Sequence, residues 1–176
     1  PGGASEASLT KDGGNTTPAY LSRSAWRLLN ASVPATGTLT IRVTHTASGQ
    51  SRAWAVVLQD AKQGAFRGNA AATGTTSPAT VNISSATDDL VLDVAGVDDT
   101  NGVSTLTVGA GQTQQANNSS FPGLGGSTEP GAGTVTMSWT LSLNNEWAIL
   151  AVSVQPVPST LLKDIIGGTG IIPFPR

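Results

Sequence analysis

The chain has 176 residues, a net charge of −2, 11% charged residues and no cysteine. This length suits one domain with a single core, and the absence of cysteine excludes disulfides and thiolate metal sites. Because basic residues are not in excess, the chain has no positively charged surface predicted for binding nucleic acid. Its longest apolar runs are far shorter than the roughly 20 residues of a membrane-spanning helix, so membrane insertion is not predicted.

Residues 1–22 are rich in Gly, Ser and Thr without periodicity, which predicts an N-terminal arm, extended or made of two loops. The chain begins at Pro1 without a signal-peptide pattern, so we expect that residues before Pro1 were removed or are not included. Residues 24–30 (SAWRLLN) predict a strand, with a single helical turn as the alternative.

The next two apolar segments are interpreted as a hairpin. Thr38 to Thr46 alternates apolar and polar residues, the period of a half-buried strand, and Arg52 to Gln59 (RAWAVVLQ) predicts a buried strand. Residues 60–79 then form a long Ala, Gly and Thr stretch that predicts a loop.

Three further strands are predicted, at Thr80 to Ser84, Asp88 to Val97 and Ser104 to Val108. Residues 109–133 are rich in Gly and predict a long surface loop. Gly133 to Pro156 predicts a hairpin around which the chain is organised, because an alternating strand and an almost wholly apolar strand flank a turn at Asn144 and Asn145. Residues 157–176 are apolar and punctuated by Pro and Gly, and they predict a C-terminal arm.

Many short strands separated by turn residues indicate an all-β fold. We therefore predict an antiparallel, jelly-roll-like β-sandwich of about eight strands at residues 23–156, with extended arms at 1–22 and 157–176.

Several segments carry a family resemblance. They are GAGQTQQANN, GSTEPGAGTVTMSWTLS and NEWAILAVSVQP, together with SAWRLLN, PATGTLTIRV and the turn after AWAVVLQD. Over roughly residues 8–156 the chain resembles a family of jelly-roll-like β-sandwich domains of tailed-bacteriophage virion proteins and bacterial secreted or surface proteins. Where that family carries further strands, before Ser8, this chain has PGGASEA. The resemblance implies a structural, adhesive or capsid-decorating role without catalytic residues.

Few residues are candidates for chemistry. His45, the only histidine, lies on the apolar face of its predicted strand, and the chain has no G-x-S-x-G motif, so a hydrogen-bonded structural residue is favoured over a catalytic one. Asp98, Asp99 and Asn101 are weak calcium candidates, with turn formation as the favoured alternative. We expect no cofactor and no enzymatic activity.

The aromatic residues allow two interpretations. Trp26, Trp54, Trp139 and Trp147 lie in apolar strand patterns, which favours core packing over a sugar-stacking platform. Phe66 and Phe121 fall in predicted loops and are the better candidates for exposed contacts.

The C-terminal segment is the strongest candidate for assembly. Its apolar side chains are costly to leave in water, and Pro173 and Pro175 keep its end out of a central strand. The assembly candidates are Leu161, Leu162, Ile165, Ile166, Ile171, Ile172 and Phe174. Either this segment folds back on its own sandwich, or it is an arm laid across a neighbouring subunit.

The expected function is that of a structural virion protein at the virion surface, a capsid decoration or tail-accessory subunit that assembles through its terminal arms. Its expected partners are copies of itself, other virion proteins, or both. The alternative is an extracellular or cell-surface module that binds carbohydrate or adheres through residues 60–79 and 109–133.

Overall fold

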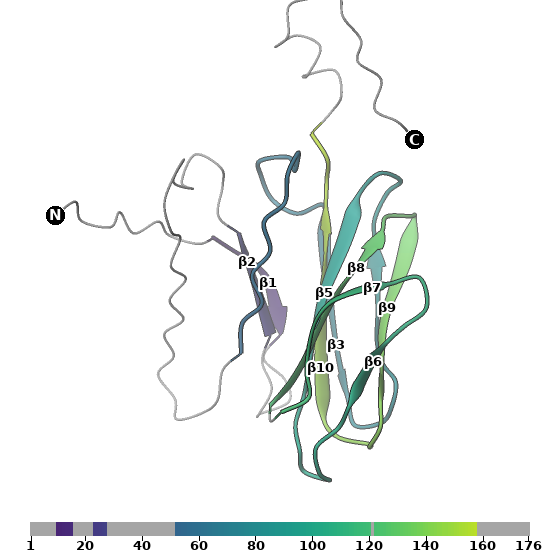
Figure 1. Cartoon of the computed structure of the whole chain (residues 1–176). Helices are drawn as coiled ribbons and strands as arrows, with labels where there is room; N and C mark the ends of the chain where they lie inside the picture. The colour runs from purple at the N-terminus through teal and green to yellow at the C-terminus, as the bar shows by residue number, and fades with distance from the viewer. Residues whose placement is uncertain (1–9, 16–22, 28–51, 121, 158–176) are drawn as a thin grey trace, which may run out of the picture.

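The computed structural model describes residues 10–15, 23–27, 52–120 and 122–157. Within these ranges the chain is all-β, without a helix, as the sequence predicts. These ranges contain ten strands, and eight of them form the two larger sheets, close to the number predicted for the sandwich (Figure 1). The ten strands are β1 (Thr10–Asn15), β2 (Arg23–Arg27), β3 (Gly68–Gly74), β4 (Ala79–Ser84), β5 (Leu90–Val97), β6 (Leu106–Val108), β7 (Thr113–Asn118), β8 (Gly123–Pro130), β9 (Thr134–Leu141) and β10 (Trp147–Val154).

Eight of these strands form two antiparallel sheets that face each other. One has the order β3-β10-β5-β8-β7 and the other the order β4-β9-β6. Alternate residues of β4, β9, β5 and β10 point between the sheets and form one apolar core. At its centre lies Trp139, which is fully buried, and Trp147 is buried beside it.

Glycines make room for the large ring at the centre of this core. A Cβ atom at Gly125 would lie 2.9 Å from three atoms of the Trp139 ring. Only a residue without a side chain therefore fits on β8 beneath this tryptophan. Gly123, Gly125 and Gly126, which contributed to the prediction of a loop at residues 109–133, lie in strand β8.

A third layer covers the outer face of the five-stranded sheet. β1 and β2 pair with each other as a separate ribbon beside this sheet (Figure 1). Leu92, Val152 and Val154 form a second apolar cluster on the outer face. The chain itself covers this cluster with Ala25, Trp54, Leu58, Ala61, Phe66 and Leu90.

The prediction of a hairpin at Gly133 to Pro156 is wrong in its pairing, although both strands exist. β9 bonds to β4 and β6, whereas β10 bonds to β3 and β5 in the other sheet. Both strands carry core side chains, and these meet across the core when the strands lie in opposite sheets. The segment is therefore an arch between the two sheets.

Three segments predicted as loops or as an arm contain strands. Residues 60–79 include β3, residues 109–133 include β7 and β8, and residues 1–22 include β1. Their Gly, Ala and Asn residues have a low intrinsic preference for strands. Backbone bonding to a neighbouring strand supplies the order instead, as between β3 and β10.

The predicted strand at Arg52 to Gln59 is also wrong. This segment belongs to neither sheet and crosses the outer face of the larger sheet, with Trp54 and Leu58 half-buried. Val57 is 88% exposed, so the apolar run does not mark a buried strand. Its predicted partner, Thr38 to Thr46, lies outside the described residues.

Candidate functional site

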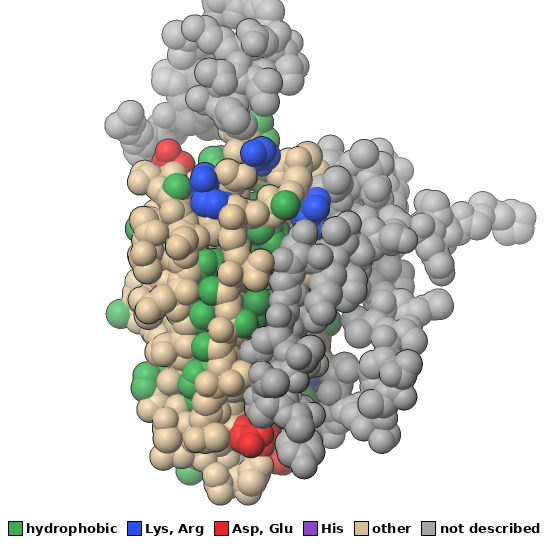
Figure 2. Space-filling view, turned by 180° about the vertical axis from the view of Figure 1, so that it is seen from behind, with side chains coloured by type: hydrophobic (Ala, Val, Ile, Leu, Met, Phe, Trp, Pro, Cys, Tyr) green, Lys and Arg blue, Asp and Glu red, His purple; other side chains and the backbone are tan. Residues whose placement is uncertain are grey.

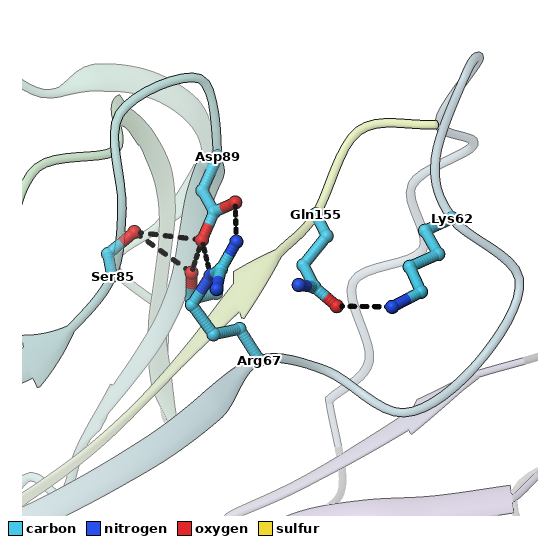
Figure 3. A network of polar contacts seen from close by, with 6 residues as sticks. Lys62, Arg67, Ser85, Asp89 and Gln155 are labelled. Atoms are coloured by element: carbon cyan, nitrogen blue, oxygen red, sulfur yellow. Dashed lines mark hydrogen bonds and ion pairs between the residues drawn. The ribbon is translucent and has the colours of Figure 1, made fainter. Parts of the chain in front are cut away.

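The candidate site lies at one end of the sandwich, where the chain leaves β10. Residues 155–157 run antiparallel to residues 60–62, with Lys62 N donating to Gln155 O at 2.9 Å and Val157 N donating to Asp60 O at 2.7 Å. The Lys62 ammonium also donates to Gln155 Oε1 at 3.3 Å (Figure 3). These bonds fix the direction in which the chain leaves the sheets, at the end opposite the β9–β10 turn (Figure 1).

The same end is held by a buried carboxylate. Asp89 is 4% exposed, and its carboxylate accepts hydrogen bonds from Arg67 Nε, from Arg67 Nη2 at 3.1 Å and from Ser153 Oγ at 2.7 Å (Figure 3). Ser85 Oγ lies 2.9 Å from Ser153 Oγ and donates to Asp89 at 3.4 Å. Asp89 therefore joins the start of β3, the β4–β5 loop and the end of β10.

The charges of this network suit a structural role. The Arg67 guanidinium holds the pKa of Asp89 below its ordinary value, and the carboxylate raises the pKa of Arg67. A carboxylate that is difficult to protonate is a weak general base. The network therefore fixes the geometry of three segments rather than supplying a reactive group.

A second carboxylate is buried between the two sheets. Asp93 Oδ1 accepts from the backbone N–H of Ser127 at 2.8 Å and from its hydroxyl at 2.7 Å, while Oδ2 accepts from Trp139 Nε1 at 2.8 Å. Gln112 extends the network by donating to Ser127 Oγ at 2.6 Å and accepting from Ser138 N at 2.7 Å. Burial raises the pKa of Asp93 to about 6, and the negative charge of Glu129 adds to the increase.

The calcium candidates form part of a turn. The Asp98 carboxylate accepts from Thr100 Oγ1 and from Glu146 N at 3.1 Å, and Asn101 Nδ2 donates to Asn144 O at 2.6 Å. Asp99 is exposed beside them. Within the described ranges, no group of three or more His, Cys, Asp or Glu side chains is placed to hold a metal ion.

The aromatic candidates separate into two groups. Trp139 and Trp147 lie in the core, and Trp147 Nε1 donates to Thr76 O at 2.7 Å. Trp54 and Phe66 are half-buried on the outer face of the larger sheet, so Phe66 is a packing residue rather than an exposed contact.

The remaining candidates cannot be placed. His45, Phe121 and all seven assembly candidates from Leu161 to Phe174 lie outside the described residues, as does the side chain of Trp26.

Sequence reasoning missed Arg67, Asp89 and Asp93 as organising residues. A polar residue within an apolar strand was the available signal, because Asp93 interrupts β5 and Ser153 interrupts β10. Such a residue must find hydrogen-bond partners when it is buried. The partners themselves lie 22 to 64 positions away in the chain, which no local pattern indicates.

No family model matches the chain, and searches of curated proteins and of solved structures likewise found no match. Among the described residues, no helix has the length and apolar character needed to span a membrane.

Proposed function

We propose that this chain is a structural, non-enzymatic subunit of a virion that assembles through its C-terminal arm. The observation that carries the proposal is the ladder between residues 60–62 and 155–157, which directs the chain out of the sandwich at a fixed place. An apolar segment that starts from a fixed root loses less freedom on binding a neighbour than one on a loose linker. Its partners would be further copies of the chain or other proteins of the virion surface.

The order of the strands supports the finer proposal of a jelly roll. β3 pairs with β10, β4 with β9 and β5 with β8, so the first strand of the eight meets the last, the second the seventh and the third the sixth. A jelly roll wraps nested pairs of this kind around one core, and viral capsid proteins and lectins use it. The departure is β7, which pairs with β8 instead of β6.

Sedimentation velocity tests the proposal on three full-length proteins. We expect the natural chain to sediment as a defined oligomer and Ile165→Asp to sediment as a folded monomer, because a charge in an apolar contact must be desolvated. Thr169→Asp adds the same charge at a polar position of the same segment and should leave the oligomer intact. A chain ending at Val157, which keeps the ladder, should match Ile165→Asp.

The assembly role would be overturned if the natural chain and both variants sediment as monomers at every concentration. Circular dichroism of each protein would confirm that the fold is unchanged.

The alternative, an extracellular or cell-surface module that binds carbohydrate, is favoured by a different observation. The outer face of the larger sheet carries an open cavity beside Trp54. Phe66, which the sequence suggested for this role, packs against the sheet instead.

A further inference from the structure

An open cavity of about 540 Å³ lies where residues 52–54 cross the edge of the larger sheet. Its lining comes from the crossing segment, from β7 and from β8: Arg52, Ala53, Trp54, Ala116, Asn117, Asn118 and Leu124. This volume falls in the range of roughly 300–1,000 Å³ that is usual for small-molecule sites. No carboxylate occurs among these lining residues.

The indole of Trp54 lies against the backbone of the sheet. A Cβ atom at Gly126 would lie 2.8 to 3.2 Å from three atoms of its six-membered ring, Cε3, Cδ2 and Cζ3. Similar distances to three ring atoms mean that one face of the ring covers Gly126. The cavity lies beside this ring, where Ala116, Asn118 and Leu124 of the sheet also line it.

Polar groups beside the ring are held in place by the chain itself. Arg52 Nε donates to Pro122 O at 2.8 Å, and Asn118 Oδ1 accepts from Ser120 N at 2.9 Å. Asn117 is engaged elsewhere, because its amide nitrogen donates to Leu106 O at 2.8 Å and to Gln114 at 3.0 Å. The side-chain oxygen of Asn118 is thus held in place, and its amide nitrogen donates no hydrogen bond to the described part of the chain.

We propose that this cavity binds a saccharide unit, with its ring packed against the indole of Trp54 and a hydroxyl oxygen accepting from Asn118. A flat aromatic face next to a few fixed polar groups suits a ligand that has an apolar ring face and a rim of hydroxyls. The described lining residues include no carboxylate to attract a cation, which fits a neutral or acidic sugar. The site goes beyond the structural role, and it does not depend on assembly.

Nuclear magnetic resonance of the full-length, nitrogen-15-labelled protein provides the test. The probes are methyl glycosides of glucose, galactose, mannose, N-acetylglucosamine and glucuronic acid, each titrated to millimolar concentration. We expect at least one glycoside to shift the indole N–H of Trp54 and the side-chain amide of Asn118. The indoles of Trp139 and Trp147 should not move, because both are buried and bonded.

Asn118→Asp removes the donor and keeps the oxygen that accepts from Ser120. We expect this substitution to weaken glycoside binding about tenfold or more, because the hydrogen bond is lost and a negative charge is added beside the ligand. Asn144→Asp is the matched control, because Asn144 accepts from Ser77 N at 3.0 Å through its side-chain oxygen and is not in the cavity lining. It should bind as the natural protein does.

The proposal is overturned if none of the five glycosides shifts Trp54, or if Asn118→Asp binds as tightly as Asn144→Asp. The titration is repeated on Ile165→Asp. Binding by that variant, if it is monomeric, would separate this site from the proposed assembly role.

Discussion

At the residue scale, the surroundings of two buried aspartates shift their pKa values in opposite directions. Asp89 lies beside a guanidinium, which lowers its pKa, whereas Asp93 is surrounded by neutral donors and Glu129, and burial raises its pKa to about 6. Asp89 therefore stabilises the fold as an anion. Asp93 is bound by hydrogen bonds that only partly replace its lost hydration.

Asp93 predicts an unusual dependence of stability on pH. Its folded pKa of about 6 exceeds the ordinary value of 3.8, so the folded state binds this proton more tightly than the unfolded state. Stability from this group is greatest below pH 4 and falls as the pH rises to 6, by about 3 kcal/mol in total.

Urea unfolding of the natural protein and of Asp93→Asn, at several pH values from 4 to 7, measures this effect. The natural protein should lose stability relative to the variant across that range, because the amide does not titrate. Parallel curves for the two proteins would contradict the prediction. Asp89 has little influence in this window, since its stabilisation is lost only as the pH falls below about 4.

At the scale of elements, a buried amide makes the largest set of side-chain hydrogen bonds in the arch from β9 to β10. Asn145 is 1% exposed; its nitrogen donates to Asp98 O at 3.1 Å and to Gly102 O at 2.7 Å, and its oxygen accepts from Asn101 N at 2.9 Å. These bonds attach the turn between β9 and β10 to the β5–β6 loop. This replaces the backbone pairing that a hairpin would have provided.

Asn145→Ala should destabilise the protein by about 3 kcal/mol, because it leaves buried backbone groups without partners. Asn82→Ala is the control: Asn82 is exposed and accepts one bond from Thr136 Oγ1, so its loss should cost about 0.5 kcal/mol. Denaturant unfolding at neutral pH compares the two. Equal losses for both variants would show that the amide does not hold the arch.

At the scale of the whole molecule, order should decrease from the centre of the larger sheet to its edge. β10 is buried at every position and is bonded on both sides, to β3 and β5. β7 is the last strand in the order of this sheet, and most of its side chains are exposed. On the face in Figure 2, charged side chains lie mainly toward the two ends, so packing and backbone bonds dominate between them.

Native-state hydrogen exchange measures this gradient directly. Amides of Trp147–Val154 should exchange slowest, near the rate set by global unfolding, and amides of Thr113–Asn118 should exchange faster by local opening. Equal protection of the two strands would mean that the sheet opens only as a whole.

The amino-acid sequence by itself determined the fold class and the strands with clear alternation. β4, β5, β6 and β9 were predictable because Val, Ile, Leu and Trp recur every second residue where one face meets the core, and β10 because it is almost wholly apolar. β3, β7 and β8 were not, since their Gly, Ala, Gln and Asn residues carry no such pattern. Gly125 and Gly126 of β8 have no side chain because Trp139 and Trp54 lie over them, and this is known only once the layers are assembled.

Only the tertiary structure decided which strands pair and which polar groups meet. Alternation shows which side of a strand is buried, but every backbone offers the same donors and acceptors, so β9 and β10 looked like partners when they belong to different sheets. The candidate sites could not be predicted from the sequence either, because their residues are far apart in the chain. Arg67, Asp89 and Ser153 come together, as Trp54 and Asn118 do, because distant segments are brought side by side by burial of the apolar faces.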